Sequence, residues 1–412
     1  MKVVFSHPTG NANVRAASLG LMKAGLLSEF HTTIACFPGS VIDQIGSLGP
    51  LKELRRRSYD PLLKPVTKMH PLLEMSRMIA LRMDLSSLTK HEKGIFSIDA
   101  VYNDLDRVVA SAIRSKSING FEAVYAYEDG ALQSFIQAKK SGIKKLYDLP
   151  IGYWRMAKQL LEIERDVWPE WAATLSGLED SEQKLQKKDE ELSLADQIFV
   201  ASTFTATTLH AYPAALAPVK VIPYGFPTVV TNRNYSPINN KPLKILFVGG
   251  LSQRKGIANL FTAIDKIEKH VQLTLVGKKP DNDCPALNKA LAKHNWISSL
   301  PHQDILKLMR ENDVLIFPSL FEGFGLVITE AMSQGTPVIT TERTCGPDLI
   351  EHGRNGWLIE AGSTGQLQQA IENLLENPEL IELTGRAALQ TAANRPWHLY
   401  GEELVASIKQ VQ

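Results

Sequence analysis

Short apolar runs rich in β-branched residues alternate with longer amphipathic stretches along nearly the whole chain. This order is typical of domains in which right-handed helical crossovers join parallel strands. In the first half we expect strands at 2–5, 33–37, 122–126, 144–147, 197–201 and 219–222. The second half repeats the pattern, with strands expected at 244–248, 272–276, 313–318, 337–341 and 357–359. The sequence therefore predicts an α/β fold with two parallel sheets.

The length of the chain and one irregular stretch predict the domain organisation. At 412 residues the chain is long enough for two domains of roughly 150–200 residues each. The stretch 224–242 is dense in Pro, Gly and Asn and lacks periodicity. We therefore expect a first domain over 1–225, a linker over 226–243 and a second domain over 244–395, before a last helix at about 398–412.

Charge, hydropathy and cysteine content exclude several classes of protein. The chain has 45 Lys plus Arg and 44 Asp plus Glu, so its net charge is +1. A balance this even argues against nucleic-acid binding by the overall charge of the protein. The apolar runs are too short for a membrane-spanning helix, and the first residues predict a strand rather than a signal peptide. Cys36, Cys284 and Cys345 are far apart in sequence, and we expect free thiols and a cytoplasmic protein.

Two segments carry an excess of one charge. Residues 52–93 hold ten basic and five acidic residues, interleaved with Leu, Met and Ile. Either they form a solvated helix face, or they contact a membrane surface or an anionic acceptor. Residues 162–196 hold eleven acidic and four basic residues around Trp168 and Trp171, which we interpret as a solvated helix face.

The sharpest chemical signal is the segment 317–332. A buried strand ends at Pro318, a loop with two glycines follows, and a helix begins near Leu326. Such a turn lets the backbone approach a ligand, and the free N–H groups of the first helical turn attract anions. Glu322 lies in the loop and Glu330 in the helix. Since carboxylates repel phosphate, we interpret them as acceptors for hydroxyls of a ribose or sugar on either side of a phosphate.

A similar turn follows the expected strand at 244–248. Gly249 and Gly250 precede the adjacent cations Arg254 and Lys255, and a helix follows. Doubly wound sheets bind their ligands at the carboxyl ends of such strands. A guanidinium fork beside an ammonium group suits a diphosphate without a metal ion.

These two turns, together with residues 221–225 and 335–338, resemble the retaining glycosyltransferases of family four. The resemblance is specific over about residues 219–359 and only topological over the first domain. It implies the GT-B fold, in which two Rossmann-like domains with parallel sheets face an interdomain cleft. The N-terminal domain would bind the acceptor and the C-terminal domain a nucleotide-sugar. The C-terminal helix would cross back, so that residues 396–412 complete the first domain.

The resemblance also implies roles for individual residues. Glu322 would contact the donor sugar, Glu330 the ribose and Lys255 a phosphate, and Glu322, Arg254 and Lys255 are the expected catalytic residues. The other donor-binding positions that it implies are Gly249, Gly250, Gly277, Pro301, Gly323, Phe324, Gly325 and Leu326.

The chain departs from the family pattern at two places. The family usually has an arginine where this chain has Gly250, and we hypothesise that Arg254 supplies the guanidinium instead. The family also often has a histidine at an N-domain strand end, where this chain has residues 125–130 and 146–150. On the acceptor side we expect Gly10 and Asn11 in the loop after the first strand, and Asp129 or Asp148, with Glu128 as an alternative.

The residues and the resemblance together predict a retaining, metal-independent hexosyltransferase. We expect a UDP- or GDP-linked sugar as donor, a glycan or lipid-linked acceptor, and a role in cell-surface polysaccharide or lipopolysaccharide synthesis. Residues 52–93 leave a peripheral position on the inner face of the plasma membrane open. The alternatives are a sugar-nucleotide epimerase or hydrolase on the same fold, or a non-catalytic nucleotide-sugar-binding scaffold. No metal or other cofactor is expected, and we interpret the D-x-D at Asp281 and Asp283 as a solvated turn.

Overall fold

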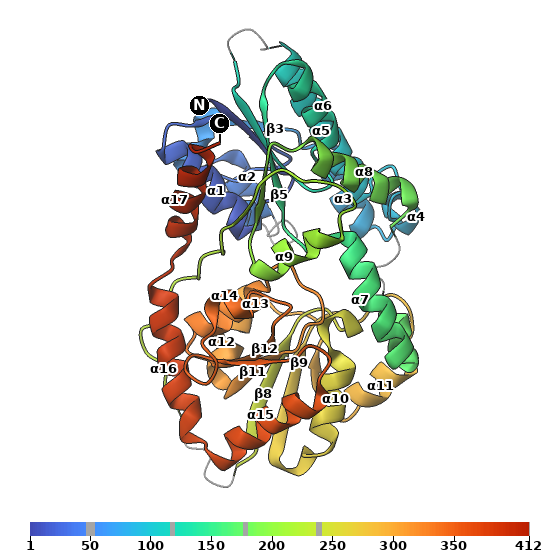
Figure 1. Ribbon diagram of the computed structural model, residues 1–412, viewed down its shortest axis with the longest axis vertical. Helices are drawn as coiled ribbons and strands as arrows, with labels where there is room; N and C mark the ends of the chain where they lie inside the picture. The colour runs from blue at the N-terminus through green and yellow to red at the C-terminus, as the bar shows by residue number, and fades with distance from the viewer. Residues whose placement is uncertain (47–53, 116–119, 176–179, 236–240, 412) are drawn as a thin grey trace.

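Two parallel sheets, one from each half of the chain, form the framework of the protein (Figure 1). The computed structural model describes residues 1–46, 54–115, 120–175, 180–235 and 241–411. Part of the basic segment 52–93, residues 236–240 of the expected linker and residue 412 lie outside these ranges.

The N-terminal sheet has the strand order β3-β2-β1-β4-β5-β6-β7, and all of its strands run parallel. Every residue of β1 and β4 is buried, since helices cover both faces of the sheet. Its strands are β1 Val3–Ser6, β2 Leu27–Thr32, β3 Thr67–Met69, β4 Ala123–Tyr127, β5 Lys144–Leu149, β6 Gln197–Val200 and β7 Val219–Val221.

The C-terminal sheet has the order β10-β9-β8-β11-β12-β13 and is also parallel. In both sheets the chain changes direction beside the first strand of the sheet, β1 or β8, which creates a crevice at the carboxyl ends of the strands. Its strands are β8 Leu243–Val248, β9 Val271–Val276, β10 Asn295–Ile297, β11 Val314–Phe317, β12 Val338–Thr341 and β13 Trp357–Ile359.

Helices connect the strands throughout. In the first half they are α1 Ala12–Lys23, α2 Val41–Ile45, η2 Pro61–Val66, α3 Leu72–Arg82, α4 Ser86–Thr89, α5 Ile98–Ser115, α6 Leu132–Lys140, α7 Trp154–Val167, η3 Pro169–Thr174, α8 Glu182–Leu194, α9 Thr203–Thr208 and η5 Leu209–Ala211. In the second half they are η6 Gln253–Lys255, α10 Ile257–Asp265, η7 Glu268–His270, α11 Pro285–Leu291, α12 His302–Glu311, α13 Leu326–Ser333, α14 Gly346–Leu349, α15 Thr364–Glu376, α16 Glu379–Ala393 and α17 Trp397–Ile408. None of the described helices combines the length and the apolar character that a membrane span requires.

The expected fold class is confirmed, and one expected strand was wrong. The second strand is Leu27–Thr32, because β1 pairs with it from Leu27 onward, and not 33–37. Residues 33–37 are buried but continue as an irregular segment. The edge strands β3 and β10 were not predicted, since three-residue strands with exposed side chains leave no apolar run in the sequence.

The C-terminal helix α17 returns to the first half of the chain and packs against α1. Figure 1 shows α16 and α17 running along one side of the molecule, with the two termini close together. Glycines allow the close approach of α1 and α17, because a Cβ on Gly20 would lie 2.8 Å from the carbonyl oxygen of Gly401. All three cysteines are buried free thiols.

Candidate functional site

The strand order brings the two predicted motifs together. Strands β8 and β11 are neighbours, so the turns that follow them meet at one edge of the C-terminal sheet. Lys255, from the turn after β8, forms an ion pair with Glu322, from the loop after β11. Nη1 of Arg254 lies 3.6 Å from Oε2 of the same carboxylate. The three residues expected to be catalytic therefore form one cluster, in which two cations flank a carboxylate.

Backbone contacts hold these two turns against each other. Nη1 of Arg254 donates to the carbonyl oxygen of Phe321 at 2.8 Å, and the amide of Leu320 donates to the Arg254 carbonyl at 2.9 Å. Nζ of Lys255 lies 4.8 Å from the ring centroid of Phe317, and its side chain is 11% exposed. Burial, and secondly the charge of Arg254, lower the pKa of this ammonium group well below its usual value, so an anion bound at the crevice would stabilise its charged form.

The glycine loop after β11 needs glycine at two positions. Gly325 has φ +90° and forms the N-cap of α13, a conformation that favours glycine. Gly323 packs so closely on the first half of the chain that a Cβ there would lie 2.0 Å from the carbonyl oxygen of Pro150. Phe324 is buried, with its ring 4.8 Å from that of Tyr224.

The glycines after β8 and β9 have different surroundings. A Cβ on Gly277 would lie 1.7 Å from the carbonyl oxygen of Gly249, so Gly277 is required by the packing of the two strand ends. The amide of Gly249 is already used, since it donates to Val276 at 2.9 Å. Gly250 is exposed, and a Cβ there would meet no other atom within 4 Å. Of these three expected donor contacts, Gly250 is the one whose surface is open.

A cavity of about 910 Å³ opens between the two halves of the chain. Leu326, Glu330 and His302 line it from the C-terminal half, and α1 and α17 line it from the opposite side. Pro301, an expected donor contact, is the N-cap of α12 and lies directly before His302. A cavity of this size suits a ligand as large as a nucleotide.

Glu330 is the most perturbed acidic group of this cavity. Burial raises the pKa of its carboxyl to about 7. Among the described residues the one ion-pairing contact of its carboxylate is with Nδ1 of His302, 3.8 Å from Oε1, and this imidazole carries a charge only when it is protonated. The pKa of His302 is lowered, mainly by burial and secondly by the charge of Arg15. A carboxylate with so few partners can still accept hydrogen bonds from hydroxyls of a ligand.

The N-terminal half holds the glycine loop in place from the other side. The hydroxyls of Ser202 and Thr205, at the start of α9, donate to the carbonyl oxygen of Gly323 at 2.6 and 2.8 Å. Asp348, at α14, accepts hydrogen bonds from the amide and the hydroxyl of Thr203. The position of Glu322 therefore depends on both halves of the chain.

A second contact between the halves comes from the acidic segment 162–196. Trp171 is buried and stacks on Phe261 of α10, with ring centroids 5.7 Å apart. Nε2 of Gln253 donates to Glu164 at 3.1 Å. The interpretation of Trp171 as part of a solvated face was wrong, because η3 lies against η6 and α11 of the C-terminal half, beside the end of α7 (Figure 1).

Two of the expected acceptor-side residues adjoin the cavity in sequence without being among its lining residues. Gly10 and Asn11 immediately precede α1, whose first residue Ala12 lines the cavity. Nη1 of Arg15 donates to the carbonyl oxygen of Gly10 at 2.6 Å. Arg15 also lines the cavity, although no sequence motif predicted it. The signal that could have found it is a cation in the first turns of the helix that follows a strand-end glycine loop.

The other two acceptor-side candidates do not line this cavity. Asp148 is 3% exposed and accepts a 2.5 Å hydrogen bond from the hydroxyl of Tyr125, while burial raises its pKa to about 7. Asp129 instead lines a polar pocket of about 450 Å³ between α5, α6 and α8. In this arrangement Asp148 presents almost no surface to a substrate.

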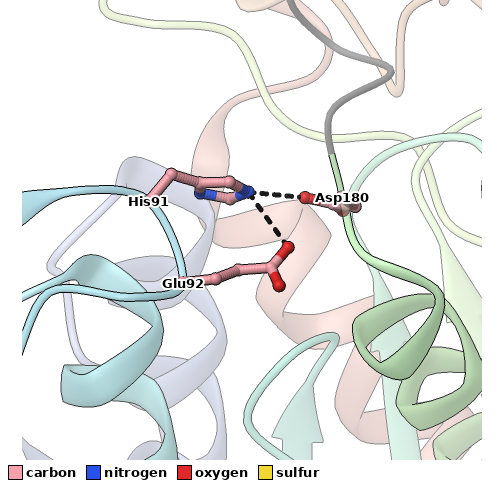
Figure 2. Close-up of side chains that lie close together, drawn as sticks. All are labelled: His91, Glu92 and Asp180. Atoms are coloured by element: carbon pink, nitrogen blue, oxygen red, sulfur yellow. Dashed lines mark hydrogen bonds and ion pairs between the residues drawn. The ribbon is translucent and has the colours of Figure 1, made fainter.

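Three potential metal ligands come together near that polar pocket, although the sequence predicted none. Figure 2 shows Nε2 of His91 between Asp180, 2.9 Å away, and Glu92, 3.3 Å away. Nζ of Lys184 lies 3.0 Å from the same oxygen of Asp180. Nζ of Lys188 lies 3.4 Å from the other oxygen, so that lysines already balance this carboxylate. The two lysines therefore compensate the charge of Asp180.

Comparison with known proteins identifies the half of the chain that carries the cluster and Glu330. Residues 228–391 match the model of the family described as glycosyl transferases group 1. This part of the chain is therefore similar to the group 1 glycosyl transferases. Arg254, Lys255, Glu322 and Glu330 all lie within the matched residues.

The curated relatives match only part of the chain. The spore coat protein SA of Bacillus subtilis is 32% identical over 178 residues, which are 39% of this chain and 47% of that protein. The glycogen synthase of Mycobacterium tuberculosis strain H37Rv is 26% identical over 156 residues, 36% of this chain and 38% of the relative. The chain thus matches less than half the length of these two relatives.

Solved structures share the fold over the whole chain. Sucrose-phosphate synthase from Thermosynechococcus elongatus superposes with a TM-score of 0.66 at 16% identity, covering 100% of this chain and 99% of that one. HepE of Anabaena in complex with UDP gives a TM-score of 0.62 at 17% identity, covering 99% and 100%. The fold is therefore GT-B, with two Rossmann-like domains.

Proposed function

We propose that the protein transfers a sugar from a nucleotide-diphosphate sugar to a hydroxyl of an acceptor. The observation that carries this proposal is the cluster of Arg254, Lys255 and Glu322 within the residues that match the group 1 glycosyl transferases. Breaking the bond between the sugar and phosphate increases the negative charge on the departing nucleoside diphosphate. Two cations at that point stabilise the leaving group, which is electrostatic catalysis.

Each remaining part of the donor has a matching group. The first turn of α13, after Gly325, offers backbone N–H groups to phosphate. Glu330 accepts hydrogen bonds from the ribose hydroxyls, and Glu322 orients the donor sugar once the diphosphate has drawn Arg254 and Lys255 toward itself. Structures of HepE contain UDP and UDP-glucose, which supports a uridine nucleotide as the first donor to test.

The transfer proceeds with retention and without a metal ion in this proposal. The acceptor hydroxyl attacks C1 of the sugar from the face that the diphosphate leaves. The C1–phosphate bond breaks, the C1–acceptor bond forms, and a phosphate oxygen takes the proton of the acceptor. The paired cations take the part that a metal ion would otherwise play. The expected acceptor is a glycan or a lipid-linked sugar of a cell-surface polysaccharide or lipopolysaccharide.

Calorimetric binding of UDP, GDP, dTDP and ADP in the presence of EDTA tests the donor site. We expect one nucleotide to bind, and Glu330→Ala to weaken that binding at least about tenfold. Glu311→Ala is the matched control, because Glu311 is exposed on α12 with 54% of its side chain accessible. The absence of binding by all four nucleotides to folded protein would contradict the donor site.

The reaction itself needs a separate test. With the donor that binding selects, Lys255→Ala is expected to lower turnover more than about tenfold, or roughly 1.4 kcal/mol of transition-state stabilisation. The anomeric configuration of the product, read by NMR, tests retention. Release of free sugar or conversion of the donor without an acceptor would instead indicate a hydrolase or an epimerase.

A further inference from the structure

Helix α3 has its polar and apolar faces reversed relative to a helix packed on a core. Its buried residues are Glu74 and Ala80, whereas Leu72, Met75 and Ile79 are 81%, 49% and 55% exposed. Positions 72, 75 and 79 share one face, because a helix completes a turn every 3.6 residues. The apolar stripe of α3 therefore faces away from the protein.

Ion pairs hold the inner face of α3. The buried carboxylate of Glu74 pairs with Arg57, and Nη1 of Arg77 lies 3.5 Å from the same oxygen. These pairs keep the carboxylate compensated where a core helix would place leucine. The orientation of α3 is thus fixed by charge, with its apolar side left uncovered.

Two exposed methionines flank the helix in sequence. Met69 precedes the helix and is 44% exposed, and Met83 follows it and is 64% exposed. We call Met69, Leu72, Met75, Ile79 and Met83 the α3 surface. A row of exposed side chains of this length marks a site that meets an apolar partner.

The segment that carries the α3 surface is rich in exposed cations. In the described part of the segment 52–93, exposed lysines and arginines outnumber exposed acidic residues. Asp84 is the one exposed acidic residue among these described residues. The exposed cations closest in sequence to the α3 surface are Lys64, Lys68, Arg82, Lys90 and Lys93. An apolar stripe bordered by cations matches the apolar and anionic layers of a lipid surface.

We propose that the α3 surface docks on an anionic lipid bilayer. Leu72, Met75 and Ile79 enter the boundary between headgroups and acyl chains, while lysines and arginines contact anionic headgroups. A second copy of this chain fits less well, because two basic surfaces would then face each other. The positive charge of this segment therefore favours an anionic bilayer over a second copy of the chain as the partner of the α3 surface.

The position of α3 connects this surface to the cleft between the halves. Helix α3 starts three residues after β3, at the carboxyl end of a sheet whose strands are parallel. Ser202, at the carboxyl end of β6 in the same sheet, contacts the glycine loop of the C-terminal half. Docking through α3 therefore brings the cleft edge of the N-terminal sheet toward the bilayer. If the proposed transferase activity holds, this position favours a lipid-linked acceptor.

Flotation of the full chain with vesicles tests the docking. We expect binding to vesicles of phosphatidylglycerol and phosphatidylcholine, weakening as salt rises, and no binding to phosphatidylcholine alone. Each exposed cation is expected to contribute about fivefold to the affinity. The double variant Met75→Glu/Ile79→Glu should weaken binding at least about tenfold, and so should Lys68→Glu/Lys90→Glu. Leu383→Glu is the control, since Leu383 is 61% exposed on α16.

The contrary outcomes are distinct. Absence of binding to the anionic vesicles, or binding that Met75→Glu/Ile79→Glu leaves unchanged, would overturn the proposal. Light scattering that shows a dimer, abolished by the same double variant, in a protein that ignores vesicles would assign the surface to a second copy. Nucleotide binding to the double variant is measured separately. A wild-type protein that binds no nucleotide would contradict the donor site but not the docking.

Discussion

The hydroxyl of Ser202 donates a 2.6 Å hydrogen bond to the carbonyl oxygen of Gly323, and this contact connects the N-terminal half to the loop that carries Glu322. Thr205 donates to the same oxygen at 2.8 Å. The candidate catalytic cluster is therefore held by side chains more than a hundred residues away in sequence, on the other half of the molecule.

Removing both hydroxyls should loosen this loop. In Ser202→Ala/Thr205→Val the buried carbonyl of Gly323 loses both donors, at a cost of about 1–3 kcal/mol. We expect a lower melting temperature and a turnover reduced about tenfold, measured by thermal unfolding and steady-state kinetics. Thr207→Ala is the control, because its hydroxyl bonds within α9, to the carbonyl of Thr203, on an exposed face. Turnover within twofold of the wild type would show that the hydroxyls do not position Glu322.

Gly323→Ala should disturb the contact between the halves more directly. The new Cβ would lie 2.0 Å from the carbonyl oxygen of Pro150, and backbone atoms on both sides must then move apart. We expect loss of activity together with a lower melting temperature. Gly365→Ala is the matched control. Gly365 lies in the first turn of α15, and a Cβ there would meet no atom within 4 Å. It should preserve or slightly raise the melting temperature. Equal effects of the two substitutions would contradict the packing argument.

Nucleotide binding should weaken in mildly acidic solution. The pKa of Glu330 is raised to about 7 by burial, so its carboxyl becomes protonated as the pH falls below 7 and can no longer accept two hydroxyl hydrogen bonds. Affinity should fall by up to about tenfold per pH unit between pH 7 and the lower pKa of the complex. Calorimetry from pH 8 to pH 5.5 measures it.

Glu330→Gln separates this titration from that of His302, whose own pKa is lowered and which lines the same cavity. We expect the pH dependence to become nearly flat in this variant above pH 6. A slope equal to that of the wild type would assign the titration to another group.

Stability should decrease as the pH rises from 5 to 7, in part through Asp148. Its pKa is raised from 3.8 to about 7 by burial, so the folded state holds a proton that the unfolded state has already released. The contribution of this group to the free energy of unfolding therefore falls by up to about 1.4 kcal/mol per pH unit in this window and levels off above it.

Denaturant midpoints at several pH values test this prediction. Asp148→Asn keeps an oxygen that can accept from Tyr125 and should reduce the slope. Asp281→Asn, on an exposed turn, should leave the slope unchanged. An unaltered slope in Asp148→Asn would mean that Asp148 is ionised in the folded protein.

The sequence by itself determined the α/β class, the two parallel sheets and the two turns that carry Arg254, Lys255, Glu322 and Glu330. These features leave local signals, because strand periodicity, glycine turns and charges at strand ends are all read within a few residues. It also suggested that residues 52–93 were unusual, but not how their side chains are arranged.

The tertiary structure decided what depends on distant contacts. The pairing of Lys255 with Glu322 follows from the adjacency of β8 and β11, and the support of Gly323 by Ser202 follows from the packing of two halves. The same is true of the burial of Trp171 against Phe261 and of Asp148 beneath Tyr125, which composition could not reveal. Burial and charge pairing are properties of the folded surroundings, and residues from separate parts of the chain supply those surroundings only after folding.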